Sequence, residues 1–331
     1  MVATLPNGWR DRVGSIAQVA RADQVIASNG AGAGTRRIEV DTGGGLAFEV
    51  LPDRGFDIGR ASFRGTALSW IGPIGHSSGS SVGERGTDWL SGFGGGLLTT
   101  CGLDSFGPAS ADGGREHGLH GRIGKMAAQV TRCEVNADRI TLAATVRQST
   151  VFAETLRLDR SVTAHLGGAM IEIEDVVTNE GPDPEGHMIL YHCNLGWPLL
   201  DDGSYVEGPG GMPVPRDPQA EAGLATWDRV HGPSDPYPEQ VFIHDAPGPL
   251  ARARLINPRL ALTLMIEWDA TTLPAMFQWK YLRRYGYVMG LEPVNTRAIF
   301  GRARARADGD MPFLAPGETR RYRLSFTVSA Q

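Results

Sequence analysis

Cysteine is scarce in this sequence, with three residues among 331 and no CxxC pair. The thiols of Cys101, Cys133 and Cys193 are odd in number and widely spaced, so they predict no disulfide framework and favour a cytoplasmic protein with free thiols. The segment Met1–Arg12 lacks the basic and then apolar order of a secretory signal peptide. We therefore expect a cytoplasmic location.

Long apolar runs and an excess of basic charge are also missing. No apolar stretch approaches the roughly 20 residues that a membrane-spanning helix needs. The 32 Lys and Arg residues are outnumbered by 37 Asp and Glu residues, and the two signs are interspersed. The sequence thus has no basic stripe for nucleic acid and no polybasic patch for a membrane, and we expect neither partner. It leaves the oligomeric state open, with a homodimer among the alternatives.

Glycine and short alternating segments are what the sequence has in abundance. The 44 glycines are about twice the usual share, which suits many turns and close backbone approaches. From Arg37 onward, apolar and polar residues alternate in short segments between turn residues, a pattern that predicts β-strands. The segments expected to form strands are 37–40, 46–50, 58–63, 140–146, 156–162, 170–177, 187–195, 241–243, 260–268, 276–279, 287–291 and 322–328.

Helical periodicity is confined to the start of the chain. Trp9, Val13, Ile16 and Ala20 are spaced as one face of a helix, so we expect a short helix at 9–22. No segment after residue 25 predicts a helix of three or more turns. Many short antiparallel strands indicate an all-β fold, a large antiparallel β-sandwich that we expect to form a single domain over residues 1–331.

The segment Arg115–Arg122 concentrates groups that carry chemistry. It contains two imidazoles, His117 and His120, together with a carboxylate, two guanidinium groups and two glycines. Histidine titrates near neutral pH and can act as general acid, general base or metal ligand. The alternative is a surface turn whose histidines are solvated or pair with Glu116.

Two further segments carry candidate catalytic groups. On the expected strand 187–195, His192 lies on one face and Tyr191 on the other. A hydrogen-bonded core histidine is the alternative for His192. Glu292 follows the apolar run 288–291, and a carboxylate there is costly to bury unless it is paired or used.

Together these segments resemble a known family. The sequence contains, in order, Leu119-His120-Gly121, His192-Cys193-Asn194-Leu195, Leu291-Glu292-Pro293 and a Phe313–Glu318 turn before the last strand. This ordered set resembles the aldose 1-epimerase (galactose mutarotase-like) family, most closely its uncharacterised bacterial branch carrying a domain of unknown function. The chain departs from the family at Cys193, which stands in the place of an aromatic residue.

The resemblance implies a galactose mutarotase-like supersandwich whose concave face binds a monosaccharide. It also implies an isomerase of carbohydrate metabolism that interconverts sugar anomers without a cofactor. Glu292 would be the general base on the anomeric hydroxyl, His192 the general acid on the ring oxygen, and His120 a hydrogen-bond donor to the sugar. Ring opening does need one base and one acid at the anomeric centre. We expect the two groups to face each other across a gap the size of a sugar, with His120 and His117 at its rim.

Other residues are candidates for binding the substrate. Arg54 is the best counterpart of a sugar-binding arginine, although a local pair with Asp57 is the alternative. The family's substrate-binding aspartate has no clean match; Glu239-Gln240 is the nearest segment. Trp89 is either core filler or a platform for a sugar ring. The substrate-binding candidates are His120, His117, Arg54, Gln240, Trp279 and Lys280.

Three alternatives concern the ligand and the chemistry. A divalent metal such as Zn, Mn or Fe held by His117, His120, His192 and Glu292 would support a sugar isomerase, epimerase or lyase. A non-catalytic carbohydrate-binding module would keep the sandwich without the chemistry. A basic cluster could select an anionic sugar, although a solvated surface is the alternative. That cluster contains Lys280, Arg283, Arg284 and Arg297.

Overall fold

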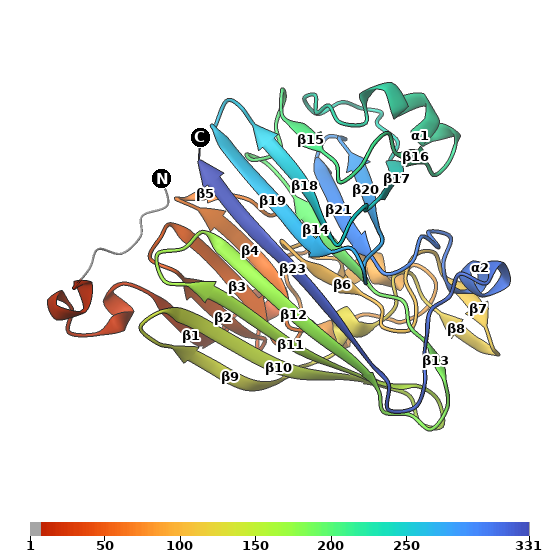
Figure 1. Cartoon of the computed structure of the whole chain (residues 1–331), viewed down its shortest axis with the longest axis horizontal. Helices are drawn as coiled ribbons and strands as arrows, with labels where there is room; N and C mark the ends of the chain where they lie inside the picture. The colour runs from red at the N-terminus through yellow and green to blue at the C-terminus, as the bar shows by residue number, and fades with distance from the viewer. Residues whose placement is uncertain (1–7, 331) are drawn as a thin grey trace.

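The computed structural model describes residues 8–330, and antiparallel β-sheet dominates it (Figure 1). The largest sheet has eight strands and carries most of the long alternating segments. In order across this sheet the strands are β15 (Tyr205–Glu207), β18 (Leu250–Asn257), β19 (Leu262–Asp269), β23 (Thr319–Ala330), β12 (Met170–Asn179), β11 (Thr155–His165), β10 (Arg139–Ser149) and β9 (Gln129–Val135).

Two further sheets have five and six strands. The five-stranded sheet contains β1 (Arg21–Ile26), β2 (Arg36–Asp41), β3 (Leu46–Leu51), β4 (Asp57–Phe63) and β5 (Thr66–Ala67). The six-stranded sheet contains, in order, β16 (Val214–Pro215), β17 (Gln240–Asp245), β20 (Ala275–Tyr281), β21 (Val288–Val294), β14 (Leu190–Leu195) and β6 (Thr99–Cys101). Two small two-stranded sheets are the hairpin of β7 (Ser110–Asp112) with β8 (Arg115–His117) and the long-range pair of β13 (Glu185–Gly186) with β22 (Phe313–Leu314).

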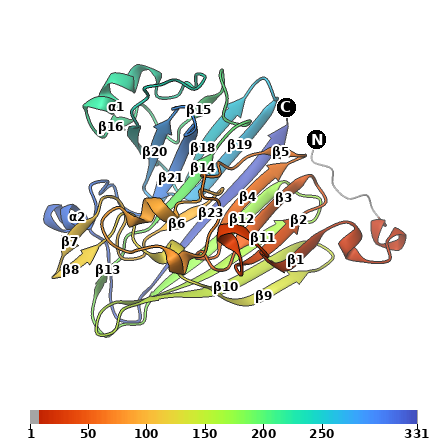
Figure 2. The ribbon, with the colours of Figure 1, turned by 180° about the vertical axis from the view of Figure 1, so that it is seen from behind.

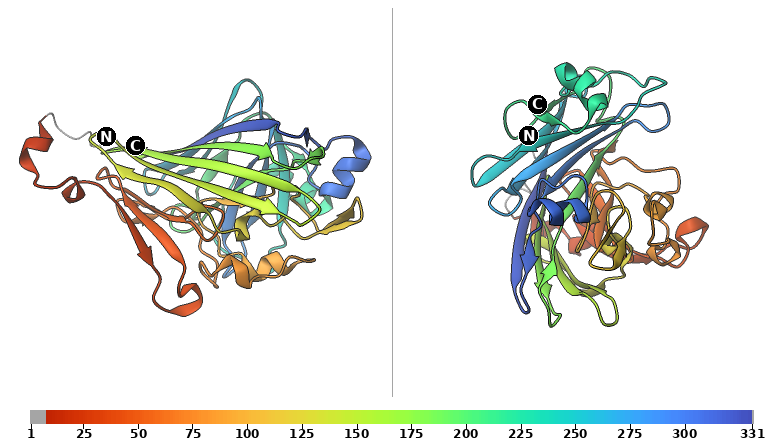
Figure 3. Two further views of the ribbon diagram at one scale, coloured as in Figure 1. Left: turned by 90° about the horizontal axis from the view of Figure 1, so that it is seen from below. Right: turned by 90° about the vertical axis from the view of Figure 1, so that its right-hand side faces the viewer.

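The three large sheets form a sandwich. Figures 1 and 2 show the eight-stranded sheet on one side and the other two sheets behind it, side by side along its length. Isolated bridges join the five- and six-stranded sheets, between Ile58 and Leu98 and between Ser69 and Leu195. The views in Figure 3 show the two layers from the edge. The predicted antiparallel β-sandwich is therefore confirmed.

The main hydrophobic core lies between the layers because each long strand alternates buried and more exposed residues. In β11 every second residue is buried, so one face of the eight-stranded sheet packs inward. Side chains such as Phe48, Leu158 and Leu291, from the three sheets, join one buried cluster. A second buried cluster, which includes Leu190 and Phe277, lies on the other face of the six-stranded sheet.

Helices are short throughout the described part of the chain. The two α-helices are α1 (Pro218–Gly223) and α2 (Arg302–Asp308). The 3₁₀ helices are η1 (Trp9–Arg12), η2 (Ile16–Gln18), η3 (Gly30–Gly32), η4 (Gly79–Ser81), η5 (Asp88–Gly92), η6 (Ile123–Lys125) and η7 (Leu224–Thr226). Within residues 8–330, no helix is long and apolar enough to cross a membrane.

The helix expected at 9–22 is wrong. That segment forms η1 and η2 and then enters β1 at Arg21. Val13 is extended between the two turns, and the Ser15 side chain accepts a hydrogen bond from the Ala17 amide to begin a new turn. No residue of η1 or η2 is buried, so no packing against the core stabilises a longer helix.

Candidate active site

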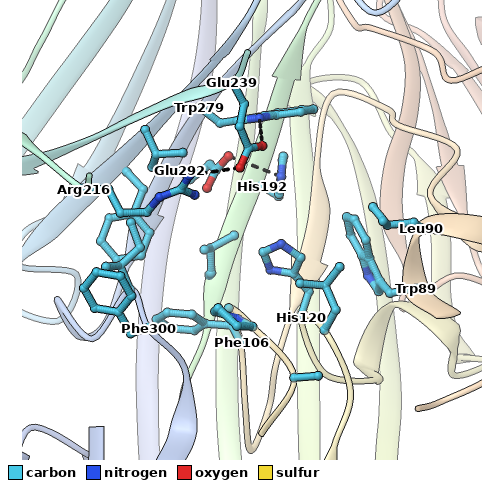
Figure 4. Close-up of a pocket in the computed structure, with 18 of the residues that line it drawn as sticks. Trp89, Leu90, Phe106, His120, His192, Arg216, Glu239, Trp279, Glu292 and Phe300 are labelled. Atoms are coloured by element: carbon cyan, nitrogen blue, oxygen red, sulfur yellow. Dashed lines mark hydrogen bonds and ion pairs between the residues drawn. The ribbon is translucent and has the colours of Figure 1, made fainter. Parts of the chain in front are cut away.

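A cavity of about 490 Å³ lies on the outer face of the six-stranded sheet, away from the main core (Figure 4). Strands β14, β20 and β21 supply its floor, and loops supply its walls. The alternation of β14 determines which side chains enter it. Tyr191 and Cys193 belong to the core between the layers, whereas His192 lines the cavity. The predicted division of these side chains between two faces is thus confirmed.

Glu292 and His192 meet at the floor of this cavity. The pairings Leu190–Val294 and Cys193–Leu291 place the two residues opposite each other on β21 and β14. Glu292 Oε1 lies 3.3 Å from His192 Nε2. The two residues are therefore neighbours on the floor of the cavity, because adjacent antiparallel strands hold opposite side chains close together. The expectation that they face each other across a gap is wrong.

Both groups are buried and retain unused hydrogen-bonding atoms. The contact between Glu292 Oε1 and His192 Nε2 is within ion-pair distance but does not have the geometry of a hydrogen bond, so within the described chain Glu292 Oε1 and His192 Nδ1 have no hydrogen-bond partner. Burial raises the pKa of Glu292 to about 8, with the charge of Glu239 adding to the effect and Arg216 opposing it. Burial also lowers the pKa of His192, and nearby His120 lowers it further. Near neutral pH the pair therefore holds one proton, on the carboxyl group. Unpaired polar atoms in a cavity are sites for a ligand.

His120 enters the same cavity from a tight loop. Its backbone has a φ of 59°, an unusual value for a residue with a side chain. The following Gly121 also has a positive φ, and a Cβ there would lie 2.3 Å from the carbonyl oxygen of Ser105. The backbone thus requires the glycine of this His-Gly motif, and His120 keeps its unusual conformation for the position that it gives the side chain. Burial lowers the pKa of His120 to about 4, and Nδ1 has no partner among residues 8–330.

Aromatic rings surround the two histidines. Trp89 stacks on Phe93 with ring centroids 4.2 Å apart and lies 4.6 Å from the His120 ring. Phe93 and Trp279 lie 5.2 and 5.5 Å from the His192 ring. Trp89 and Trp279 both line the cavity, and Trp89 is also buried in the second hydrophobic cluster. Aromatic walls of this kind are typical of small-molecule pockets.

A small polar network closes one end of the cavity. Arg216 Nη2 donates to Glu239 Oε1 at 3.0 Å, and Arg216 Nε donates to Asp217 at 2.7 Å. Trp279 Nε1 donates to the other Glu239 oxygen at 3.0 Å. Arg216 is a site residue that the sequence did not predict, because it lies in a segment rich in Gly and Pro between β16 and α1. No periodic pattern there indicated a site residue.

Two predicted site residues, Gln240 and Lys280, do not line the cavity, because their side chains point away from it along their strands. Gln240 follows Glu239, and its side chain accepts a hydrogen bond from the Tyr237 hydroxyl instead of lining the cavity. Lys280 follows Trp279 on β20 and is buried on the other face, where Nζ donates to the Thr226 carbonyl at 2.7 Å. Successive residues of a strand point to opposite faces, so in both cases the neighbour lines the cavity.

Arg54 does not line the cavity either. Its Nη2 donates to the Gly92 carbonyl at 2.7 Å, so it supports the loop that carries Trp89 and Phe93. The local pair with Asp57 is also replaced. Asp57 accepts a hydrogen bond from Arg160 at 2.8 Å instead, because both are buried between the sheets.

His117 is separated from the other histidines. Its Nδ1 lies 2.9 Å from Asp104 Oδ2, and it lines a different surface hollow. Burial alone would raise the pKa of Asp104, but the hydrogen bond and charge of His117 hold it at about 2. The four-residue metal set is thus not assembled, and residues 8–330 contain no group of three or more His, Cys, Asp or Glu side chains arranged for a metal ion.

The basic residues considered for an anionic ligand lie outside the cavity. Arg283 pairs with Asp235 at 3.1 Å, and Arg297 pairs with Asp245. These two ion pairs are exposed, which agrees with the alternative of a solvated surface, whereas Lys280 is buried. Arg216 lines the cavity with the reactive pair, and its charge is balanced by two carboxylates.

Comparisons with known proteins give a family and a fold. A family model described as "Domain of unknown function (DUF4432)" matches residues 32–328. No curated protein matches the sequence. Among solved structures, a proposed aldose 1-epimerase from Klebsiella pneumoniae is 24% identical with a TM-score of 0.87, over 94% of this chain and 83% of that one.

More distant structures share the same architecture. A galactose mutarotase-like protein from Clostridium acetobutylicum is 11% identical with a TM-score of 0.67, over 95% of this chain and 100% of that one. A galactose 1-epimerase from Lactobacillus acidophilus is 14% identical with a TM-score of 0.63, over 94% and 99% of the two chains. At these identities the likeness establishes the galactose mutarotase-like fold, and function has to be argued from the site.

Proposed function

Since this chain belongs to the DUF4432 family and has the galactose mutarotase-like fold, we propose that it is an aldose 1-epimerase-like enzyme that opens the ring of a monosaccharide. The observation that carries the proposal is the contact between Glu292 and His192. The two buried groups lie 3.3 Å apart, with unused atoms, at the floor of a cavity lined by aromatic residues. The proposed reaction needs no cofactor.

The reaction uses two oxygens on the same carbon. Glu292 as carboxylate takes the proton of the anomeric hydroxyl, and the C1–ring oxygen bond breaks as an aldehyde forms. His192 as imidazolium gives its proton to the ring oxygen. Both oxygens are bonded to C1, so an acid and a base on adjacent strands can reach them together. Rotation about C1–C2 and the reverse transfers close the ring as the other anomer.

The proton count of the pair suits this cycle. The reactive form holds one proton, on His192, and ring opening leaves one proton on Glu292. Burial raises the pKa of Glu292 and lowers that of His192, so it favours a neutral pair with one proton on Glu292. The product state has the same number of protons. Protons of a coupled pair belong to the pair and not to one residue. His120 would donate a hydrogen bond to the bound sugar.

The test is acceleration of anomer interconversion, followed by polarimetry or NMR over common hexoses, pentoses and their acids. Glu292→Gln and His192→Asn should each lower the rate by on the order of 10²-fold or more, the usual contribution of a general acid or base. A matched surface pair, His165 and Glu172 with nitrogen and oxygen 3.9 Å apart, provides controls. His165→Asn and Glu172→Gln should leave the rate unchanged.

A carbohydrate-binding module without chemistry is the other outcome of this experiment. In that case some sugars would bind, but the protein would accelerate the anomer interconversion of none of them. Glu292→Gln would then leave the rate of interconversion unchanged. Wild-type protein that fails to accelerate interconversion of any sugar it binds would overturn the enzyme proposal.

A further inference from the structure

The candidate active-site cavity has two chemically different ends. The network of Arg216, Glu239 and Trp279 occupies one end, next to Glu292. Figure 4 shows Phe106 and Phe300 at the opposite end, with His120 in between. The apolar end is continued by side chains that line the same cavity. Leu119 and Ile299, the chain neighbours of His120 and Phe300, line the cavity, and Phe277 packs against Phe106 from its place beside Glu292.

The apolar end of the cavity is backed by closely packed, buried side chains. Phe106 and Phe277 pack edge to face with ring centroids 6.0 Å apart, and both are fully or almost fully buried. Ile299 is also buried. The backbone carbonyl of Gly107, which could have bound a hydroxyl group, already accepts the His120 amide at 2.9 Å. Sugar hydroxyl groups placed against this wall would lose hydrogen bonds to water, which is unfavourable.

The cavity is also larger than a simple sugar. One water molecule takes up roughly 30 Å³ of the liquid, so the twelve heavy atoms of a hexose, which are packed more closely by covalent bonds, need less than about 360 Å³. The cavity measures about 490 Å³. A hexose beside Glu292 and His192 would therefore leave a space next to the aromatic wall.

Exposed apolar side chains lie at the rim of the cavity. Phe300, which is 55% exposed, continues the wall toward solvent, and Leu90, which is 58% exposed, lies beside Trp89 on the other side of the cavity (Figure 4). Large apolar side chains beside a cavity are typical of a surface that a ligand covers. A bound group that reaches past His120 would remove part of the Phe300 ring from water.

We propose that the substrate is a reducing sugar that carries an apolar substituent, an alkyl or aryl group on one of its hydroxyl oxygens. The sugar ring lies against Glu292 and His192, and the substituent lies against Ile299 and Phe300, in front of the buried Phe106 ring. The anomeric hydroxyl stays free. The position of the sugar ring rests on the proposed function. The apolar character of the substituent is inferred from the apolar residues that line the cavity.

Calorimetric titration with glucose, galactose and mannose and with their 2-, 3-, 4- and 6-O-benzyl ethers tests the proposal. At least one benzyl ether should bind roughly ten- to a hundredfold more tightly than its parent sugar, the gain expected from burying an aromatic group. Phe300→Ala should reduce that advantage by on the order of fivefold. Phe300 is exposed enough for the variant to fold.

Phe152→Ala is the matched control, because Phe152 is fully exposed and lies outside the cavity. It should leave every affinity unchanged. Benzyl ethers that bind no better than their parents, or an advantage that Phe300→Ala leaves intact, would overturn the apolar subsite.

Anomer interconversion, measured on the same sugars, separates this proposal from the proposed function. Phe300-dependent binding of a benzyl ether without accelerated interconversion would refute the enzyme and keep the subsite. Accelerated interconversion of parent sugars with no preference for the ethers would refute the subsite and keep the enzyme.

Discussion

Glu292 Oε1 lies 3.3 Å from His192 Nε2, on hydrogen-bonded neighbouring strands, with both side chains about 5% exposed. Two titratable groups so close in a buried site influence each other, and their titration is a property of the pair. The raised pKa of the carboxyl group and the lowered pKa of the imidazole leave one proton on the pair across the neutral range. This arrangement has a direct kinetic consequence.

The rate of anomer interconversion should be bell-shaped in pH with a broad top. Above about pH 8, the pKa of Glu292, the pair loses its only proton and no general acid remains. On the acidic side, below the ordinary histidine value, the pair gains a second proton and no general base remains. The measurement is kcat/KM for free enzyme and sugar between pH 4 and 10.

Variants of the polar network supply the control for this profile. The charge of Glu239 raises the pKa of Glu292 and that of Arg216 lowers it. Glu239→Gln should therefore move the alkaline limb to lower pH, and Arg216→Met should move it to higher pH. An alkaline limb that both variants leave in place would argue that another group controls it.

The stability of the protein should also depend on Glu292. Burial raises the pKa of its carboxyl group from the ordinary value of 4.5 to about 8 in the folded chain. Between these values the folded state binds more protons than the unfolded state, so folding stability from this group falls as pH rises. Glu292→Gln does not titrate there. Its free energy of unfolding should exceed that of wild type by a margin that grows, on the order of a few kcal/mol, from pH 5 to 8.5.

Urea denaturation of the two proteins at several pH values measures that margin. Glu172→Gln, at an exposed position, should show no such trend. A constant difference between Glu292→Gln and wild type would mean that the carboxyl group is ionised in the folded protein at neutral pH.

Period-two alternation carried most of what the sequence could predict. It placed the strands, and it correctly separated His192 from Tyr191 on β14. The same rule, applied to 276–279, could have excluded Lys280, because Trp279 and Lys280 cannot share a face. Strand parity therefore predicts which face a residue occupies once one cavity-lining neighbour is known.

Loops account for the residues that sequence could not place. His117 and His120 are three residues apart, yet the left-handed backbone at His120 and Gly121 separates their side chains into two different hollows. No periodicity exists in a loop to predict this. Arg216 and Phe300 reach the cavity from connecting segments for the same reason, and only the fold brings them to Glu292.

Activity should not depend on a metal ion. His117 is held by Asp104 in a separate hollow, so His120, His192 and Glu292 lack the fourth ligand considered from the sequence. Elemental analysis of the purified protein should find far less than one metal per chain, and chelators should leave interconversion unchanged. His117→Ala should keep the rate. It should lower stability, because it removes the imidazole that pairs with the buried Asp104 carboxylate. Stoichiometric metal that is lost in His120→Ala would contradict this view.

Anionic sugars should bind no more tightly than neutral ones. Arg216 is the guanidinium group that lines the cavity, and it already pairs with Glu239 and Asp217. Two carboxylates against one guanidinium give this end of the cavity no positive charge for a phosphate, and Arg283 and Arg297 pair with carboxylates elsewhere.

Calorimetry with glucose and glucose 6-phosphate at low and high salt compares the two classes. The phosphate should bind equally or more weakly, and added salt should not weaken its binding selectively. A phosphate ester that binds at least tenfold more tightly at low salt, with the advantage lost in Arg216→Met, would show that Arg216 leaves its carboxylates to hold the ligand.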